Sequence, residues 1–390
     1  MSVTLRLPRA DGTLHPYTLQ APRVWPRAAR AVERNRVAYA AAHVVADPFA
    51  AADPWLMPAI DWDATLAFRA HLWSLGFGVA EAMDTAQRGM GLDWATSLEL
   101  ITRSLALARA TPGALIACGA GTDHLEPRAS VGVDDVIAAY RLQCEAVESR
   151  GGRIILMASR ALAACARSPD DYARVYGTLL AEVREPVILH WLGDMFDPAL
   201  AGYWGHADTG EAMNVCLDIL REHATKIDGI KISLLDKTKE IAMRRRLPRG
   251  VRMYTGDDFD FAELIAGDAR GHSDALLGIF DPIAPAAAAA LDALAAGERA
   301  QFDAILGPAV PLSRHVFKPP TRFYKTGVVF LAWLNGHQQH FVMVGGQQSA
   351  RNLLHFVELF ALADSAGLLR NPELAAQRMR TLLALHGVAA

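Results

Sequence analysis

The stretch that decides the fold is residues 151–191, GGRIILMASRALAACARSPDDYARVYGTLLAEVREPVILHW. The apolar runs Arg153–Ala158 and Pro186–Trp191 have the length and composition of buried strands. Between them, Pro169–Val183 has helical spacing, with Ser168 as a candidate N-cap and Pro169 at the first helical position. A strand, a helix and a second strand in this order predict one βαβ unit of a parallel sheet.

The same alternation continues on both sides of this stretch. The expected strands are Arg36–Val45, Gly78–Met83, Ala114–Cys118, Arg153–Ala158, Pro186–Trp191, Asp228–Leu234, Val251–Thr255 and Ala275–Phe280. The expected helices are Asp63–Leu75, Asp93–Ala110, Val133–Ser149, Pro169–Val183, Gly210–Thr225, Lys237–Arg246, Asp260–Ala266 and Ala286–Leu306. Eight strand–helix units in about 270 residues predict an α/β fold of the (β/α)₈ TIM-barrel type. The rival is a doubly wound sheet, but no Gly-x-Gly-x-x-Gly follows the first strand.

Three regions follow from this reading. Residues 1–33 are expected to be an N-terminal extension, residues 34–310 the (β/α)₈ barrel, and residues 311–390 an additional C-terminal helical region. In the last region the spacing predicts amphipathic helices over Asn352–Leu362 and Glu373–Leu385.

Composition excludes several classes of protein. The 390 residues are 52% hydrophobic and 21% charged, with a formal net charge of -3, which excludes a disordered chain. No half of the chain is strongly basic, so no nucleic-acid partner is expected, and no apolar run approaches the ~18 residues of a membrane span. The N-terminus carries charges where a secretory signal would be apolar, and the four cysteines lack a Cys-x-x-Cys spacing. We therefore expect a cytoplasmic protein without a structural metal.

The most informative single residue is Lys231, inside the apolar strand Asp228-Gly-Ile-Lys-Ile-Ser. Its side chain points either into the barrel or into the helix layer, because a strand alternates its faces. A buried ammonium is costly unless it is paired or neutralised, and a lysine with a lowered pKa can form a Schiff base with a carbonyl. The alternative is a lysine that pairs with Asp257 or Glu81.

Further polar residues follow the expected strands, where barrel enzymes carry their chemistry. His190 is a candidate general acid/base because an imidazole titrates near neutrality, although it could equally be only hydrogen-bonded in the barrel mouth. Arg160 offers a bidentate fork for a carboxylate or phosphate. Asp194 could orient His190 or bind a hydroxyl. The predicted catalytic residues are Lys231 and His190, and the predicted substrate-binding residues are Glu81, Asp84, Thr122, Asp123, Arg160, Asp194 and Asp257.

Two motifs carry a resemblance to a known family. Gly229-Ile230-Lys231 on the expected sixth strand is followed by Thr255-Gly256-Asp257-Asp258 after the seventh. This pair resembles the dihydrodipicolinate synthase / N-acetylneuraminate lyase superfamily of class I aldolases. The resemblance implies a barrel from about Arg36 to Leu306 with Lys231 as the Schiff-base residue, and oligomeric assembly.

The sequence departs from the family pattern at three places. His190 stands where the synthases and lyases carry a proton-relaying tyrosine. The arginine that usually follows has no counterpart in Leu192–Asp197, and Glu81–Gly89 replaces the usual Gly-Thr-Thr-Gly-Glu turn. The resemblance thus implies a divergent branch that acts on another keto acid or a keto sugar.

The leading hypothesis is a Schiff-base-forming lyase or aldolase for a keto acid or keto sugar, without cofactor or metal. A metal-dependent barrel hydrolase or isomerase of carbohydrate metabolism is the second, since Glu81, Asp123, His124, His190 and Asp194 supply oxygen and nitrogen donors. A non-catalytic small-molecule sensor is the third. The apolar tail after residue 320 exceeds what barrel closure needs and predicts a homodimer or homotetramer.

Overall fold

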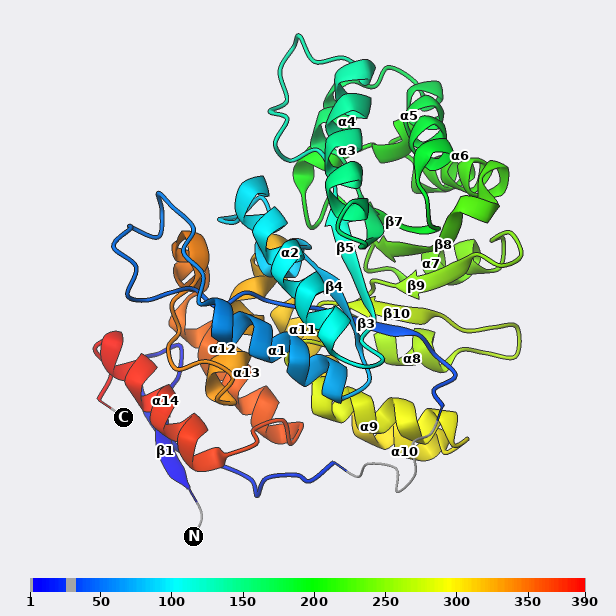
Figure 1. The fold of residues 1–390 in the computed structure, drawn as a ribbon. Helices are drawn as coiled ribbons and strands as arrows, with labels where there is room; N and C mark the ends of the chain where they lie inside the picture. Colours follow the sequence, from blue (N-terminus) through cyan, green and yellow to red (C-terminus); the bar gives the residue numbers. More distant parts are fainter. Residues whose placement is uncertain (1–2, 26–32, 390) are drawn as a thin grey trace.

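The computed structural model describes residues 3–25 and 33–389. Eight parallel strands close into a barrel at the centre of the molecule (Figure 1). In order around the barrel they are β3 (Ala38–Ala41), β4 (Gly78–Glu81), β5 (Ile116–Ala120), β6 (Arg153–Met157), β7 (Val187–Leu192), β8 (Ile227–Ser233), β9 (Arg252–Thr255) and β10 (Asp274–Leu277), which pairs back with β3. The predicted (β/α)₈ barrel is confirmed, and the doubly wound sheet is wrong.

Side chains alternate between the barrel interior and the helix layer. The interior core is formed by Tyr39, Ala41, Ala80, Met83, Ala117, Ile155, Ile188, Tyr254 and Leu276, packed separately from the much larger core between strands and helices. Gly229 belongs to the interior face, because a Cβ built on it would lie 2.6 Å from the Tyr254 ring. Since residues two apart share a face, the residues that follow this layer at the carboxyl ends of the strands also point inward.

The helix layer follows the expected order. Its members are α1 (Trp62–Ser74), α2 (Trp94–Ala110), α3 (Val133–Glu148), α5 (Pro169–Glu182), α6 (Thr209–Glu222), α7 (Lys237–Arg244), α8 (Phe261–Ala266), α9 (Ala284–Ala295) and α10 (Arg299–Leu306), with the short α4 (Arg160–Cys165) after β6. The single helix expected over Ala286–Leu306 is wrong, because Gly297 takes a φ of 81° and separates α9 from α10. Pro169 opens α5 as predicted, but the Ser168 side chain makes no capping hydrogen bond.

The tail consists of α11 (Ala309–Val316), α12 (Tyr324–Leu334), α13 (Leu353–Ser365) and α14 (Pro372–Leu385). The two helices expected from spacing correspond to α13 and α14. Every residue of α12 is buried, including its two polar residues Lys325 and Thr326. The tail reaches the carboxyl end of the barrel, where Gln87 Nε2, after β4, donates a hydrogen bond of 2.7 Å to the Val344 carbonyl.

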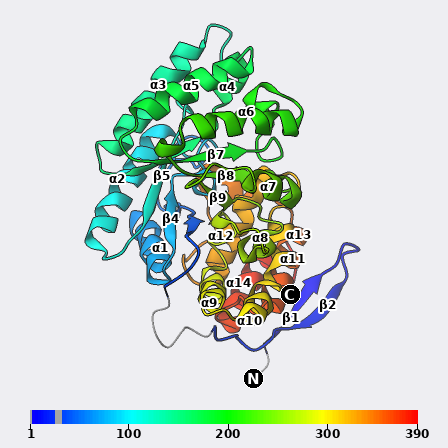
Figure 2. The ribbon, with the colours of Figure 1, turned by 90° about the vertical axis from the view of Figure 1, so that its right-hand side faces the viewer.

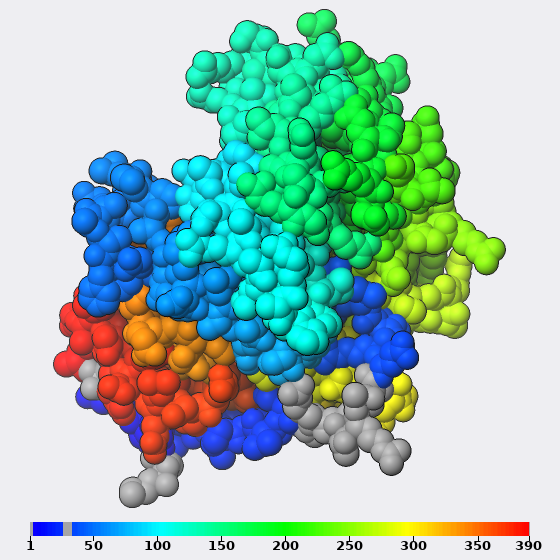
Figure 3. Space-filling view, viewed as in Figure 1, coloured from blue at the N-terminus to red at the C-terminus, as the bar shows by residue number. Residues whose placement is uncertain are grey.

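The first part of the expected N-terminal extension forms regular secondary structure. An antiparallel hairpin of β1 (Thr4–Pro8) and β2 (Leu14–Thr18) lies beside α13 and α14 (Figure 2). The Tyr17 hydroxyl donates to Asp364 on α13 over 2.9 Å, and Arg380 on α14 donates to the Thr4 carbonyl over 2.7 Å. The two ends of the chain thus share one surface of the molecule (Figure 3). Residues 26–32 of the expected extension lie outside the described residues.

Across residues 3–25 and 33–389, the model contains no helix with both the length and the apolar character of a membrane span.

Candidate active site at the carboxyl end of the barrel

Lys231 and His190 lie side by side inside the barrel. In the parallel pairing of β7 with β8, His190 is opposite Lys231, just as Ile188 is opposite Gly229. Both pairs share the interior face, so Lys231 points into the barrel and not into the helix layer. Lys231 is 7% exposed and His190 2% exposed. The structure therefore answers the question of orientation that the strand pattern alone left open.

The Lys231 ammonium lacks a contact ion pair: within the described ranges no carboxylate oxygen lies within 4.0 Å of it. Burial lowers its pKa, and the charges of Asp258 and Asp84 counteract this only in part, so the pKa is below its usual value. Space for the lysine chain comes from Gly256, where a Cβ would lie 2.7 Å from Lys231 Cε. Lys231 is thus a buried amine with an increased neutral fraction near pH 7.

Asp258 is the acidic residue whose charge acts most strongly on the pKa of Lys231. The sequence instead predicts Asp257 as the partner of Lys231 or as a substrate-binding residue. Asp257 Oδ1 accepts backbone hydrogen bonds from Phe259 (2.8 Å) and Asp260 (3.0 Å), so it shapes the turn after β9. Asp258 Oδ1 accepts from the Ile279 amide over 2.9 Å, and burial raises the pKa of Asp258 to about 7. Tyr254, Gly256 and Asp258 are each two residues apart, so they point to the same face of the strand. Because Tyr254 faces the barrel interior, this alternation could have identified Asp258 as an inward-facing residue.

His190 is a neutral imidazole in this site. Burial, aided by the charge of Lys231, holds the pKa of His190 well below its usual value. Its Nε2 lies 3.4 Å from Ser233 Oγ, and its buried Nδ1 has no hydrogen-bond partner in the described part of the chain. A neutral imidazole with an unused nitrogen can accept or donate a proton.

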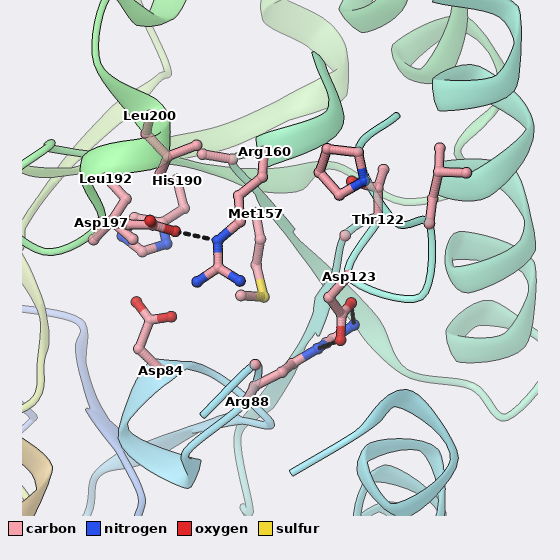
Figure 4. Close-up of a pocket in the computed structure, with 15 residues that line it drawn as sticks. Asp84, Arg88, Thr122, Asp123, Met157, Arg160, His190, Leu192, Asp197 and Leu200 are labelled. Atoms are coloured by element: carbon pink, nitrogen blue, oxygen red, sulfur yellow. Dashed lines mark hydrogen bonds and ion pairs between the residues drawn. The ribbon is translucent and has the colours of Figure 1, made fainter. Parts of the chain in front are cut away.

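A cavity opens above His190, bounded by the ends of β4 to β7 (Figure 4). It is lined by Asp84, Arg88, Gly89, Gly121, Thr122, Asp123, Leu125, Pro127, Met157, Ala158, Arg160, His190, Leu192, Asp197 and Leu200. The Arg160 guanidinium and the Asp84 carboxylate point into it from opposite sides, as Figure 4 shows. No side chain in the described ranges donates a hydrogen bond to Asp84. The structure therefore brings Asp84, Thr122, Asp123, Arg160 and His190 to one cavity.

Two of these lining residues are already engaged with protein partners. Asp123 pairs with Arg88 (Oδ1 to Nη2, 2.7 Å) and accepts a hydrogen bond from Gln143 (2.9 Å). Thr122 Oγ1 lies 2.6 Å from Ser159 Oγ. Arg160 uses Nε to bind Asp197 at 2.5 Å, which leaves its two terminal amino groups available.

Glu81 and Asp194 lie elsewhere. Glu81 has the parity of the helix layer and forms a fully buried pair with Arg69 of α1 (2.8 and 2.9 Å), with Ser104 Oγ at 2.6 Å as a further donor. Burial raises the pKa of Glu81, but Arg69 and the other donors lower it below its usual value. Asp194 is exposed and lines a different hollow, with Trp191 and His206. We therefore remove Glu81 and Asp194 from the candidate substrate-binding residues.

The donors of the metal hypothesis do not converge. Across the described ranges, no three His, Cys, Asp or Glu side chains are grouped so that they could hold a metal ion. Glu81, Asp123 and Asp194 occupy three separate surroundings, as described above. That the reaction needs no metal stays a prediction.

The tail contributes residues that sequence reasoning missed. The Tyr324 hydroxyl lies 2.8 Å from Thr85 Oγ1, in the turn after β4. Burial and the charges of Asp84, Asp258 and Asp281 raise the pKa of Tyr324 far above its usual value. Lys325 is buried beside it, and the charge of Asp84 also acts on the pKa of Lys325. Nothing in the spacing of Tyr324 and Lys325 signals this, because both open an apolar helix far along the chain from the barrel strands.

Solved structures share this fold at low identity. Dihydrodipicolinate synthase from Thermotoga maritima aligns with a TM-score of 0.63 and 11% identity over 86% of this chain and 100% of its own. The enzyme from Oceanobacillus iheyensis aligns at 0.59 and 14%, over 83% and 95% of the two chains. A prophage protein of the dihydrodipicolinic acid synthase family from E. coli K12, in complex with pyruvate, aligns at 0.62 and 12%, over 91% and 99%. The fold that the two motifs implied is thereby confirmed.

Sequence comparison identifies the family itself. No curated protein matches the chain. A family described as "Protein of unknown function (DUF993)" matches residues 5–388, nearly the whole sequence. The chain forms a barrel of the dihydrodipicolinate synthase fold with its own arrangement of polar residues, and it belongs to the DUF993 family.

Proposed function

We propose that this protein is a Schiff-base-forming lyase or aldolase that acts on a keto acid or keto sugar, with Lys231 as the nucleophile. The observation that carries the proposal is the position of Lys231 in the barrel interior. It is buried, has no contact carboxylate among the residues that the structure describes, and lies opposite a neutral His190 that lines the cavity. An amine in such surroundings is the form that attacks a carbonyl. The shared fold, and the pyruvate bound by the E. coli protein of that fold, support a keto-acid substrate.

The proposed reaction starts with attack of Lys231 Nζ on the carbonyl carbon. The carbinolamine loses water to give an iminium ion. A base then takes the proton of a hydroxyl on the β-carbon, the bond between the α- and β-carbons breaks, the β-carbon leaves as the carbonyl carbon of the first product, and the bonding electron pair moves toward the nitrogen. The resulting enamine takes up a proton at carbon, and water releases the product and the free amine. His190 is the proposed general acid/base. Its Nδ1 has no partner among the described residues and its Nε2 reaches only Ser233 Oγ, so the ring nitrogens can carry these protons. The reverse sequence forms the bond.

The structure also supports an oligomer as part of this proposal. The loop between β3 and α1 presents Phe49, Trp55, Leu56 and Met57 with exposed fractions of 93%, 77%, 78% and 60%. Exposed apolar side chains gathered on one loop are typical of association surfaces. We propose a homodimer or homotetramer, which light scattering checks against the 42.2 kDa of one chain. A cytoplasmic location is proposed on the four free cysteines.

Borohydride trapping tests the function. The protein is incubated with a panel of keto acids and keto sugars, reduced with borohydride and digested, and each peptide is weighed. We expect one substrate-dependent adduct on Lys231, and none in Lys231→Arg, because arginine keeps the charge but forms no imine. Lys237→Arg is the matched control, since Lys237 pairs with Glu263 away from the cavity. An adduct without turnover would support the sensor, and chelator-sensitive turnover without an adduct would support the metal enzyme.

A further inference from the structure

A second buried lysine, Lys325, lies behind the cavity lining, where its Nζ contacts Met90, the residue after the lining Gly89. Lys325 is 5% exposed, and its Nζ donates to the Arg322 carbonyl over 3.1 Å and meets Met90 Sδ at 3.4 Å. An ammonium has three donors, and a thioether sulfur is a weak acceptor. No carboxylate within the described ranges lies within 4.0 Å of it. Lys325 is therefore a buried cation whose hydrogen-bonding capacity is only partly used.

The surroundings of Lys325 connect it to the cavity. Burial lowers the pKa of Lys325 to about 8, and Asp84, Arg160 and Asp197, all of which line the cavity, act on the same pKa. The Met90 sulfur that contacts Nζ belongs to the residue after Gly89, another lining residue. A Cβ built on Gly89 would lie 3.4 Å from Arg160 Nη1. Lys325 and Arg160 thus approach two consecutive residues, Arg160 at Gly89 and Lys325 at the side chain of Met90.

Arg160 has donors to spare on its cavity side. Its Nε binds Asp197, and its terminal amino groups point into the cavity toward Asp84 (Figure 4). The Arg160 charge lowers the pKa of Lys325, because the two cations repel each other. An anion placed between them would accept hydrogen bonds from both and remove this repulsion.

We propose that Lys325 and Arg160 form a subsite for an anionic group of the substrate, a carboxylate or phosphate distinct from the carbonyl that reacts with Lys231. The inference rests on the proposed function and narrows its substrate class. The substrate is a keto compound with an acid group at the end remote from the reacting carbonyl, such as a dicarboxylic keto acid or a keto-sugar phosphate. Met90, with its flexible thioether, turns aside to let the anion reach Lys325.

The charges around the subsite favour an anion despite Asp84. Asp197 is paired with Arg160, and Asp123 with Arg88. Asp84 has no ion-pair partner within the described ranges; it points into the cavity opposite Arg160, and its charge raises the pKa values of Lys231 and Lys325. When Lys325 and Arg160 bind the anion, the charge of Asp84 still acts on Lys231. The tail helix α12 therefore contributes to substrate selection as well as to packing.

Binding of simple anions tests the subsite without any carbonyl chemistry. Calorimetric titration of the full chain with succinate, inorganic phosphate and acetate measures affinity for an anion alone. We expect succinate or phosphate to bind and acetate to bind much more weakly. Lys325→Met and Arg160→Met each weaken this binding by about 10- to 100-fold, the usual effect of losing one charged hydrogen bond. Lys237→Met is the matched control and leaves it unchanged.

The outcomes separate the two proposals. Lys231→Gln keeps the anion affinity if the subsite is independent of the imine. Tighter binding of phosphate than of succinate assigns a keto-sugar phosphate, and the reverse order assigns a dicarboxylic keto acid. Anion binding that depends on Lys325, in a protein that gives no borohydride adduct, sustains the subsite and refutes the lyase. An adduct that forms equally well in wild type and Lys325→Met, with equal anion binding, overturns the subsite. If Lys325→Met does not fold, Lys325→Arg and Arg160→Met decide, with affinity kept in the first and lost in the second.

Discussion

The hydroxyl of Tyr324 lies 2.8 Å from Thr85 Oγ1, which joins the tail helix α12 to the turn after β4 across 239 residues of sequence. Both side chains are buried, so each depends on the other for a hydrogen bond. Close to this contact, a Cβ on Gly278 would lie 3.1 Å from the Tyr324 ring, which places the ring at the end of β10. The tail thus closes the barrel mouth near Asp84 and Asp258.

Replacing Tyr324 by phenylalanine removes this contact and leaves the Thr85 hydroxyl unpaired. We expect the free energy of unfolding to fall by about 1–2 kcal/mol, the usual cost of an orphaned buried donor. Urea denaturation measures it. Thr85→Val in the same background should restore part of the loss, because both partners are then apolar. Equal losses that simply add in the double variant would contradict the pairing.

His190→Ala should separate imine formation from turnover. The nucleophile is intact in this variant, so the borohydride adduct on Lys231 should persist. Turnover should fall by about 10²–10⁴-fold, the contribution of one general acid/base. Adduct yield and steady-state rate are compared on the same preparation. Unchanged turnover would remove His190 from the mechanism.

Gly256→Ala tests the space that Lys231 needs. The added Cβ would meet Lys231 Cε at 2.7 Å, Ser233 Oγ at 2.3 Å and the Ile232 carbonyl at 2.6 Å. Lys231 must then shift, and we expect at least a tenfold slower rate of adduct formation, in line with the cost of misplacing a reacting group. Gly132→Ala is the control, since its added Cβ has no neighbour closer than 3.8 Å. Identical trapping rates in the two variants would show that Lys231 is not confined there.

Glu81→Gln should destabilise the fold and leave the cavity intact. It breaks the buried pair with Arg69 and leaves an uncompensated guanidinium, so unfolding should become easier by about 3–5 kcal/mol. Chemical denaturation measures the loss, with the exposed Glu126→Gln as control. If succinate or phosphate affinity fell while stability did not, Glu81 would belong to the binding site after all.

Glu240 should make stability depend on pH. It is fully buried with Thr255 and Ser273 as partners, and burial raises its pKa to about 8 in the folded protein. Because the folded pKa exceeds the unfolded one, the stability that this group contributes is full below pH ~4.5 and is lost as the pH rises to about 8. Linkage gives a loss of roughly 4 kcal/mol over this interval. Asp258 acts in the same direction, with its pKa raised to about 7.

The comparison of wild type with Glu240→Gln isolates this effect. The amide stays neutral, so the difference in unfolding free energy between the two proteins should grow in favour of the variant from pH 5 to pH 8. Thermal or urea unfolding across this range gives the difference at each pH. Parallel curves would show that Glu240 is ionised in the folded state.

The barrel could be predicted from the sequence because its signals are local. Each strand is a short apolar run, and the apolar residues of each helix have helical spacing. The order strand, helix, strand can therefore be recognised without any long-range contact in Arg153–Met157, Pro169–Glu182 and Val187–Leu192. The helix boundaries within the alanine-rich sequence could not be predicted, because a single residue, Gly297, separates α9 from α10.

The site could be predicted only as far as strand ends reveal it. Thr122, Asp123 and Arg160 follow their strands, His190 lies near the end of β7, and all four line one cavity. The remaining residues are placed by the alternation of side chains along each strand. Glu81 lies on the outer face and Asp258 on the inner face, and both positions follow from this alternation once the interior layer is known. Tyr324 and Lys325 could not be found this way, because the contact that brings them to the barrel is tertiary and leaves no local pattern.

Because the tail supplies Tyr324 and Lys325, the order of synthesis matters for this protein. All eight barrel strands leave the ribosome before α12 does, so a closed barrel can form before the helix that packs against its carboxyl end is synthesised. The hairpin β1–β2 is synthesised long before α13 and α14, the helices that it contacts, so these contacts form only after both helices have been synthesised. The nascent barrel therefore exposes the apolar surfaces that α12 and the hairpin later cover. The packing at the barrel mouth is therefore complete only after α12 has been synthesised, and the packing of the hairpin only after α13 and α14.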